Sequence, residues 1–254
     1  MIKYYGFVLS KLIEKYHINN QVVAPDGTEY RRVFDAVFID ALKTELGYTA
    51  LLALLFCAVF AYLIGSLNFA VIISKLFFKD DVRLHGSGNA GATNMLRTYG
   101  NAAGIATFVC DALKGAVSVL LSMLILGEGG AYVGGLFCIL GHIFPVFYKF
   151  RGGKGVVVSA VTILCLEPLA FLFLLVLFVL IVGMSKYISL GSVICAFFFP
   201  LIQNAFSQAD GFISFISTTI SVLIAVIVIV MHKENIKRLM NRTENKLSFK
   251  KKGA

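Results

Sequence analysis

Charged side chains are scarce in this chain, at 15% of its 254 residues, whereas hydrophobic types make up 58% and phenylalanine occurs 23 times. An ordinary soluble domain carries about 25% charged residues and about 45–50% apolar ones. The shortage of charge therefore excludes a typical soluble protein, and the sequence predicts an integral membrane protein.

Cysteine pairs at redox or metal-binding spacing are also missing. The five cysteines are scattered in or beside apolar segments without a CxxC pair, and only His142, four residues after Cys138, stands at a ligand-like spacing. We interpret the cysteines as small buried hydrophobic residues, and we predict no disulfide framework and no zinc site.

Carboxylates are few and poorly placed for catalysis. The chain has 14 acidic residues and no HExxH motif, and its adjacent pair Asp80 and Asp81 is flanked by Lys79 and Arg83. A G-x-S-x-G motif is absent as well. These gaps argue against a glycosidase, a metalloprotease, a two-metal phosphatase and a Ser–His–Asp hydrolase. The sequence predicts neither a metal nor a cofactor.

Long apolar runs dominate what is present, and a spanning helix needs about 20 such residues. They predict an all-α fold of about seven transmembrane or partial-membrane helices, at residues 49–78, 111–126, 131–148, 155–166, 168–184, 188–206 and 212–231. The run 155–166 is too short to span alone. Residues 91–108 are expected to add an interfacial or re-entrant helix.

Basic residues fall only in alternate connections between these helices. The connections at residues 127–130, 167 and 207–211 contain none, whereas the tail from His232 holds eight Lys or Arg. By the positive-inside rule, the basic connections and the tail face the cytoplasm, which places residue 48 outside. A multi-pass protein of the cytoplasmic membrane is predicted.

The first 48 residues differ from the rest, with six basic and six acidic side chains. We interpret residues 1–48 as an appended segment of unknown role, with an interfacial helix as one reading, and residues 49–254 as one membrane domain with a basic cytoplasmic tail. The net charge of +9 arises after residue 48, at helix ends and in the tail. This placement favours a membrane surface over nucleic acid as partner.

The segment "HGSGNAGATN" at residues 85–94 is too polar and too rich in glycine for a membrane span. Glycines permit positive φ, and backbone N–H groups, hydroxyls and amides ahead of a helix N-terminus favour an anion. A plain helix-capping turn is the alternative, but Arg97 one turn later favours phosphate binding. The candidate ligands here are Gly86, Ser87, Gly88, Asn89, Gly91, Thr93, Asn94 and Arg97.

Three further polar clusters are predicted on the same side of the membrane. They are "DALKG" with Asp111 and Lys114, "GHIFPVFYKFRGGKG" with His142, Arg151, Gly152, Gly153 and Lys154, and "HKEN" with His232 and Asn235. Each has a plainer reading as well: a local ion pair, a basic loop that obeys the topology rule, or a structural histidine. The "RGGKG" segment does not fit the Walker A pattern.

In order and spacing, "GSGNAGATNMLRTYG", "DALKG", "GHIFPVFYKFRGGKG" and "HKENIKRL" resemble the motifs of the PlsY-type acyl-phosphate:glycerol-3-phosphate acyltransferases, over about residues 60–247. The resemblance implies transfer of a fatty acyl group from acyl phosphate to the 1-hydroxyl of glycerol 3-phosphate, giving lysophosphatidic acid and phosphate. It also implies a seven-helix fold with a cytoplasmic-face site, surrounding membrane lipid and an upstream enzyme that forms acyl phosphate.

Site roles follow from the resemblance motif by motif. It implies catalytic roles for Ser87, Lys154, His232 and Asn235, and phosphate binding for Arg97, Gly152 and Gly153. We expect substrate or phosphate binding by the remaining candidates, including Lys114, His142 and Arg151, with a structural role as the alternative for Lys114. Two positions depart from the pattern, because Arg151 stands where lysine is expected and Val158 where threonine is usual.

One rival class uses the same anion-binding loops: a transporter or channel for phosphate or a phosphorylated metabolite. Such a protein is expected to carry polar residues through the bilayer midplane and repeat symmetry, yet residues 168–184 are apolar almost throughout and no repeat is visible. A non-catalytic scaffold would not need phosphate-binding loops. The His and Asp separated by four residues in thioester-dependent acyltransferases are absent too.

Overall fold

The computed structural model describes residues 45–207 and 211–247, and within these ranges every regular element is a helix. The helices are α3 Glu45–Gly65, α4 Phe69–Phe78, η1 Val82–Leu84, α5 Ala92–Tyr99, α6 Asn101–Ile143, η2 Val146–Tyr148, α7 Val156–Leu166, α8 Pro168–Ser185, α9 Ile188–Phe206, α10 Gly211–Met231 and α11 Lys233–Met240. The all-α membrane fold is confirmed. The interpretation of residues 1–44 lies outside the described residues, and the boundary expected at residue 48 falls inside α3.

The first predicted helix, 49–78, is two helices. Asn68 caps the second one, because its Oδ1 accepts a hydrogen bond from the backbone N–H of Val71 at 3.1 Å. An amide at this position competes with the helical backbone and starts a new helix in its place. The chain therefore turns between Gly65 and Phe69, and α4 lies at the level of the polar loops.

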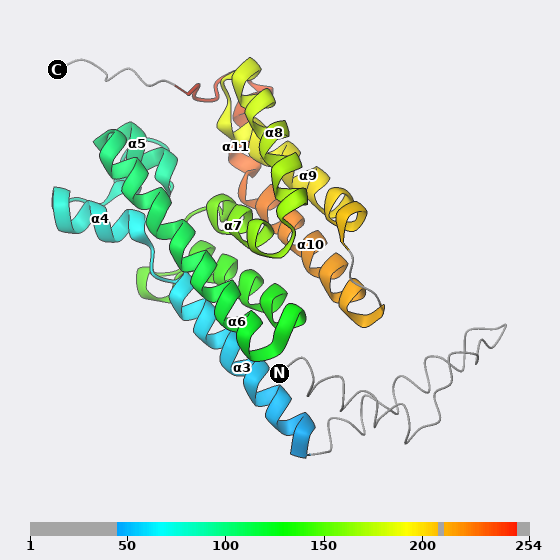
Figure 1. The fold of residues 1–254 in the computed structure, drawn as a ribbon. Coiled ribbons are helices and arrows are strands. Elements are labelled where there is room, and N and C mark those ends of the chain that lie inside the picture. Colours follow the sequence, from blue (N-terminus) through cyan, green and yellow to red (C-terminus); the bar gives the residue numbers. More distant parts are fainter. Residues whose placement is uncertain (1–44, 208–210, 248–254) are drawn as a thin grey trace. The chain divides into compact units, whose positions relative to one another are not determined.

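Helix α6 holds two of the predicted helices in one 43-residue element whose backbone breaks at Gly127, with φ 68° and ψ −156°. The first part begins at Asn101, directly after Gly100 and earlier than the predicted residue 111. Asp111 and Lys114 form an ion pair within the helix, so their charges do not mark its start. The second part ends at Ile143 and turns back along the first, so that a Cβ at Gly134 would overlap Ser122. Figure 1 shows this hairpin in green.

Helices α7 to α10 pack in sequence, and α10 closes back onto α6. Helix α7 has only 11 residues and lies between α6 and the later helices (Figure 1). The shared core contains Tyr132, Ile139, Ile143, Val158 and Ile224. The described residues contain five helical segments that are long and apolar enough to cross a membrane, with α6 counted once. Counting the two parts of α6 separately and adding the short α7 gives about seven.

Two short helices lie beside the polar loops. A helix was expected at residues 91–108, and the observed α5 is shorter: it ends at Tyr99, because Gly100, with a φ of 90°, separates it from α6. Helix α11 was not predicted. Helix α11 follows α10 directly after His232, and the segment beyond it returns to the molecule, where the N–H of Leu247 donates to the carbonyl of Lys186 at 2.7 Å. This return brings residues 245–247 next to Arg97 of α5 and to Lys186.

Candidate active site

A cavity of about 620 Å³ lies among α5 to α10 and the segment after α11, within the size range of small-molecule sites. Ten predicted site residues line it: Ser87, Asn89, Gly91, Thr93, Asn94, Arg97, His142, Lys154, His232 and Asn235. The other six, Gly86, Gly88, Lys114, Arg151, Gly152 and Gly153, lie outside its wall. Asp111 of the "DALKG" motif lines the cavity as well, so all four motifs, far apart in sequence, meet at one cavity.

The glycine loop, residues 85–91, contains two of the positive φ angles that its glycines permit. Gly86 and Gly88 have φ values of 58° and 70°, a region that residues with a Cβ rarely enter. Gly91 differs from the expectation, because its φ of −154° is extended and it serves as the N-cap of α5. Two of the three glycines thus shape the turn, and the third begins the helix.

Asn94 braces this loop from inside. Its Nδ2 donates to the carbonyls of Val82 at 3.1 Å and His85 at 2.9 Å, and its Oδ1 accepts from the N–H of Ser87 at 2.9 Å. The side chain is buried. Because its amide is fully engaged with the loop backbone, Asn94 fixes the shape of the loop and the position of Ser87.

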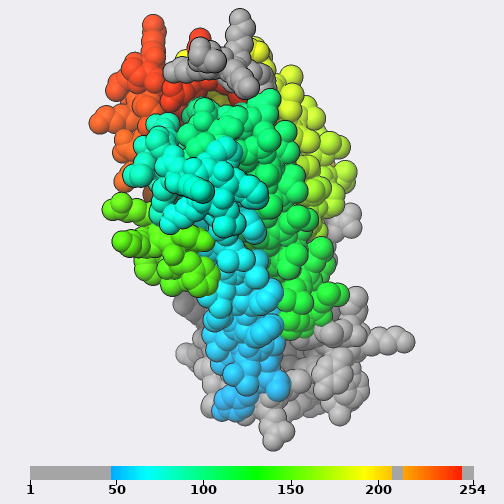
Figure 2. All heavy atoms as spheres, turned by 90° about the vertical axis from the view of Figure 1, so that its left-hand side faces the viewer, coloured from blue at the N-terminus to red at the C-terminus, as the bar shows by residue number. Residues whose placement is uncertain are grey.

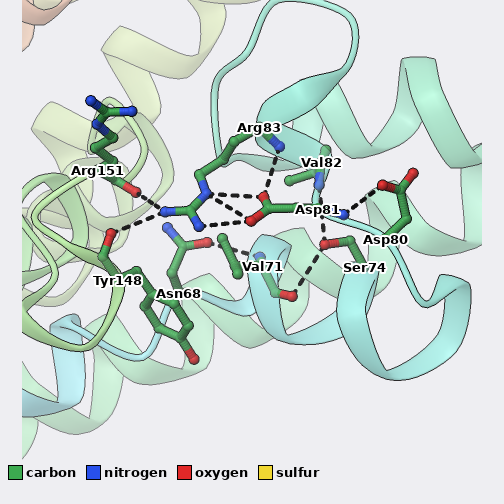
Figure 3. Close-up of polar contacts among 9 residues, drawn as sticks. All are labelled: Asn68, Val71, Ser74, Asp80, Asp81, Val82, Arg83, Tyr148 and Arg151. Atoms are coloured by element: carbon green, nitrogen blue, oxygen red, sulfur yellow. Dashed lines mark hydrogen bonds and ion pairs between the residues drawn. The ribbon is translucent and has the colours of Figure 1, made fainter.

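Arg83, just before the glycine loop, links this segment to the loop that carries Lys154 by hydrogen bonds. The Arg83 guanidinium lies 2.7 Å from Asp81 Oδ2, and its Nη1 donates to the carbonyls of Tyr148 at 3.0 Å and Arg151 at 3.3 Å, as Figure 3 shows. This hydrogen bond from Arg83 lowers the pKa of Asp81. Figure 2 shows the bright green segment before α7 lying beside the cyan segment of α4 and η1. From the sequence, Asp81 and Arg83 were only part of an acidic pair with basic neighbours, and the contact with the second loop was not predicted.

Gly152 and Gly153 hold the same loop against the end of α6. Their N–H groups donate to the carbonyls of Ile143 and His142, both at 3.1 Å. A Cβ at either position would overlap His142. These N–H groups are used within the protein rather than pointing into the cavity, which gives both glycines a packing role in setting the position of Lys154. Phosphate binding by them stays a prediction.

Lys154 and Asn235 meet at the polar end of the cavity, where the lysine ammonium donates to Asn235 Oδ1. Burial lowers the pKa of Lys154 to about 8, and the neighbouring positive charges of Arg238 and Arg97 act in the same direction. The positive charges of Lys154 and Arg97 that gather here are suited to a dianionic phosphate.

Glu244 is a functional candidate that sequence reasoning missed. It is 8% exposed and lines the cavity. Its Oε1 accepts from Asn235 Nδ2 at 2.9 Å and from Ser189 Oγ at 3.1 Å, and its Oε2 accepts from Arg238 Nε at 2.7 Å. Burial opposes ionisation, but these donors hold the pKa of Glu244 below its ordinary value. Its sequence surroundings, a basic tail, gave no signal of burial.

His232 is buried at the junction of α10 and α11, with Nδ1 2.7 Å from the carbonyl of Val228. Because a carbonyl can only accept, Nδ1 carries the proton in this arrangement. Burial lowers the pKa of His232 to about 4, against the effect of the Val228 hydrogen bond. At neutral pH the ring is therefore uncharged, and its Nε2 has a free lone pair.

Lys114, Asp111 and His142 form a separate buried cluster. The Lys114 ammonium lies 2.8 Å from Asp111 Oδ1, 2.9 Å from His142 Nδ1 and 2.8 Å from the carbonyl of Leu67. The local pair that the spacing allowed is thus present. Asp111 and His142 line the cavity, whereas Lys114 stands behind them; substrate contact by Lys114 stays a prediction.

Arg97 and Arg151 are both exposed but differ in place. Arg97 lies at the cavity wall, and its Nη2 is 3.4 Å from the carbonyl of Asn245 in the returning tail. Arg151 offers its carbonyl to Arg83 while its side chain lies outside the wall. Of the two arginines, Arg97 is the one placed to reach an anion in the cavity.

Below these charges, the cavity wall is apolar. It includes Leu164, Phe171, Leu174, Leu175, Phe178, Phe199, Ile224 and Val228. One end can thus hold an anion, and the other can hold a hydrocarbon chain. Fold and site together define a polytopic helical membrane protein with an internal amphipathic ligand cavity.

Comparison with known proteins places the chain within that class. A family model described as glycerol-3-phosphate acyltransferase matches residues 55–242. A glycerol-3-phosphate acyltransferase of Finegoldia magna is 41% identical over 196 residues, which cover 77% of this chain and 97% of the relative. Glycerol-3-phosphate acyltransferase 2 of Bacillus anthracis is 42% identical over 189 residues, covering 74% and 96%. The chain belongs to the glycerol-3-phosphate acyltransferase family.

Solved structures agree. The glycerol 3-phosphate form of PlsY (YgiH), an integral membrane glycerol 3-phosphate acyltransferase, matches with a TM-score of 0.70 and 32% identity, over 77% of this chain and 96% of that one. The lysophosphatidic acid form matches with a TM-score of 0.69 and 31% identity over the same shares. The resemblance read from the four motifs is confirmed at the level of family and fold.

Proposed function

We propose that this protein transfers a fatty acyl group from acyl phosphate to the 1-hydroxyl of glycerol 3-phosphate, releasing lysophosphatidic acid and inorganic phosphate. The observation that carries the proposal is the amphipathic cavity, which joins Lys154, Asn235 and Arg97 to an apolar wall. Relatives named glycerol-3-phosphate acyltransferase and PlsY forms with glycerol 3-phosphate and lysophosphatidic acid support it.

The polar end has the groups that two phosphates require. We assign Arg97 and Lys154 to the phosphate charges, and the glycine loop with Ser87 to the acyl-phosphate side. A guanidinium binds phosphate in a bidentate manner, and an ammonium acts as a point charge. The acyl chain would lie along Leu174, Phe178 and Phe199, where burial of its methylenes supplies affinity.

The reaction requires little of the enzyme beyond alignment. The glycerol hydroxyl oxygen attacks the acyl carbonyl carbon, the C–O bond to phosphate breaks, and phosphate leaves with the electron pair. The hydroxyl proton passes to a phosphate oxygen or to Nε2 of His232, which is uncharged and can accept it. Because acyl phosphate is already activated, no enzyme nucleophile is needed, and proximity in such a site can lower a barrier by about 7–11 kcal/mol.

The polar end belongs on the cytoplasmic side in this proposal. It is built by the basic connections and by α11, which the positive-inside rule places in the cytoplasm of a cell-membrane protein. A water-soluble glycerol phosphate would enter from that side, and an upstream enzyme would supply acyl phosphate within the bilayer.

The test is direct. The protein purified in detergent is given palmitoyl phosphate or palmitoyl-CoA together with glycerol 3-phosphate, and lysophosphatidic acid is measured by mass spectrometry. Product with palmitoyl phosphate alone is expected. Product only with the thioester would overturn the donor, and glycerol 3-phosphate uptake by proteoliposomes without any product would favour the transporter.

Lys154→Ala is expected to lower kcat/KM by about 10²- to 10³-fold, because it removes a charge that stabilises phosphate and oxyanion in a water-poor site. Lys237→Ala, which removes an exposed lysine from α11, is the matched control and should retain activity. Unfolding by heat, followed with a thiol-reactive dye at the buried Cys138, checks that both variants fold. Equal turnover in the two variants would remove Lys154 from the site.

A further inference from the structure

Glu244 lies one contact away from the pair that the proposed function uses. It accepts a hydrogen bond from Asn235 Nδ2 at 2.9 Å, and the other end of the same amide, Oδ1, accepts from the ammonium of Lys154. The three side chains form a continuous relay from the returning tail to the polar end of the cavity. Asn235 is buried and Glu244 is 8% exposed.

Only one orientation of the Asn235 amide satisfies both of its neighbours in this relay. An asparagine amide can be turned by 180° at little internal cost, which would exchange its oxygen and its NH₂ group. The Glu244 carboxylate only accepts and the Lys154 ammonium only donates. Together they allow one orientation, with NH₂ toward Glu244 and oxygen toward Lys154. Without Glu244, Asn235 loses one of the two groups that fix its orientation, and its NH₂ group loses its acceptor.

We propose that Glu244 is a positioning residue for the acyl transfer: it orients Asn235 and, through Asn235, holds the Lys154 ammonium at the phosphate end of the cavity. Glu244 does not touch the reacting atoms in this role. The inference rests on the proposed function, since it assigns Lys154 to substrate phosphate.

Charge adds a second effect on the same lysine. The charged or titratable groups around Lys154 are Arg97 on α5, His232 and Arg238 at α11, and Glu244 after α11. Glu244 raises the pKa of Lys154, whereas burial, Arg238 and Arg97 lower it. Loss of the carboxylate should therefore shift deprotonation of Lys154 to lower pH.

A merely structural role has to be separated from this one, because Glu244 also fastens the tail through Arg238 and Ser189. Arg238→Gln and Glu244→Gln both break the ion pair at 2.7 Å, but they change the charge near Lys154 in opposite directions. If the tail alone matters, both variants should shift the pH profile in the same way. If Glu244 acts on Lys154, the shifts should be opposite.

The experiment measures kcat and KM for glycerol 3-phosphate against pH in the purified full chain with palmitoyl phosphate. We expect Glu244→Gln to move the basic limb of kcat/KM to lower pH and Arg238→Gln to move it to higher pH. Glu244→Ala, which also removes the acceptor for Asn235, should raise KM on the order of tenfold. Glu244→Asp should restore part of the loss, and Glu234→Gln, at an exposed position of α11, should behave as wild type.

The inference would be overturned if the basic limbs of Glu244→Gln and Arg238→Gln shifted in the same direction. It would also be overturned if a folded Glu244→Gln enzyme kept the wild-type KM and pH profile. Should Glu244→Ala fail to fold by the thiol-dye assay, Glu244→Gln still decides, because it keeps an acceptor oxygen and the volume of the side chain. Failure of the proposed function looks different: the wild-type enzyme itself would then make no lysophosphatidic acid from palmitoyl phosphate.

Discussion

The two sides of the polar end of the cavity are held in different ways. On one side, the glycine loop is fixed mainly by hydrogen bonds to its own backbone, with the neutral amide of Asn94 at its centre. On the other side, Lys154, Asn235 and Glu244 are joined through charged groups and a returning tail. A backbone-braced loop keeps its shape over a wide pH range, whereas a charge-linked relay depends on protonation.

The largest effect should come from breaking the brace. Asn94→Leu replaces a buried amide with an apolar side chain of similar size. It leaves the N–H of Ser87 without its acceptor and takes one of the two donors from each carbonyl of Val82 and His85. Each unsatisfied buried group costs about 1–3 kcal/mol. We expect a marked fall in thermal stability by the thiol-dye assay, with activity lost in parallel.

Gly183→Ala is the control for that assay, because a Cβ at this position meets no atom within 4 Å. If Asn94→Leu unfolded at the temperature of this control, the loop would not depend on the amide. The contrast between the two sides of the cavity would then disappear.

The next effect concerns pH and belongs to the charged side. Burial lowers the pKa of Lys154 to about 8, so its positive charge is complete well below that pH and is lost as pH rises through it. We expect kcat/KM to fall by about tenfold per unit above that value, as expected for an essential protonated group. The pKa of His232, near 4, leaves that ring neutral throughout this range.

Lys154→Arg sharpens the same measurement, because a guanidinium keeps its charge to far higher pH. In this variant the basic limb should disappear from the range between pH 7 and about pH 10, even if turnover is reduced. A limb unchanged in Lys154→Arg would assign the titration to another group.

The smallest effect should follow from loosening the tie between the two loops. Arg83→Gln removes the ion pair to Asp81 and weakens the bonds to the carbonyls of Tyr148 and Arg151. Because these groups are partly exposed, we expect a loss of only about 1 kcal/mol in stability and a few-fold rise in KM for glycerol 3-phosphate. Lys149→Gln, which changes an exposed charge in the tied loop, should leave KM unchanged.

Long apolar runs made the membrane helices predictable. Helices α7, α8 and α9 match the expected 155–166, 168–184 and 188–206 closely. The ends of α7 and α8 coincide with glycine, proline or charged residues. The break between α3 and α4 was missed, since Ser66, Leu67 and Asn68 are too few to interrupt an apolar run in sequence, yet the Asn68 cap suffices to end a helix.

The candidate site was predicted in part. Residue type and spacing identified Arg97, Lys154, His232 and Asn235, all of which line the cavity. They could not separate residues that face the cavity from those behind it, so Lys114 and Gly152 were grouped with them. Glu244 was missed because its burial depends on a tail that returns after α11, a contact with no local signal in the chain.

By itself, the sequence determined that this protein is a helical membrane protein and, through four spaced motifs, the family to which it belongs. Apolar length and local residue chemistry decide these features, and both can be read along the chain. Only the tertiary structure decided which polar groups meet: Asn94 turns inward on its own loop, and Asn235 lies between Lys154 and Glu244. These contacts join residues distant in sequence, so packing of the helices, rather than any local pattern, brings them together.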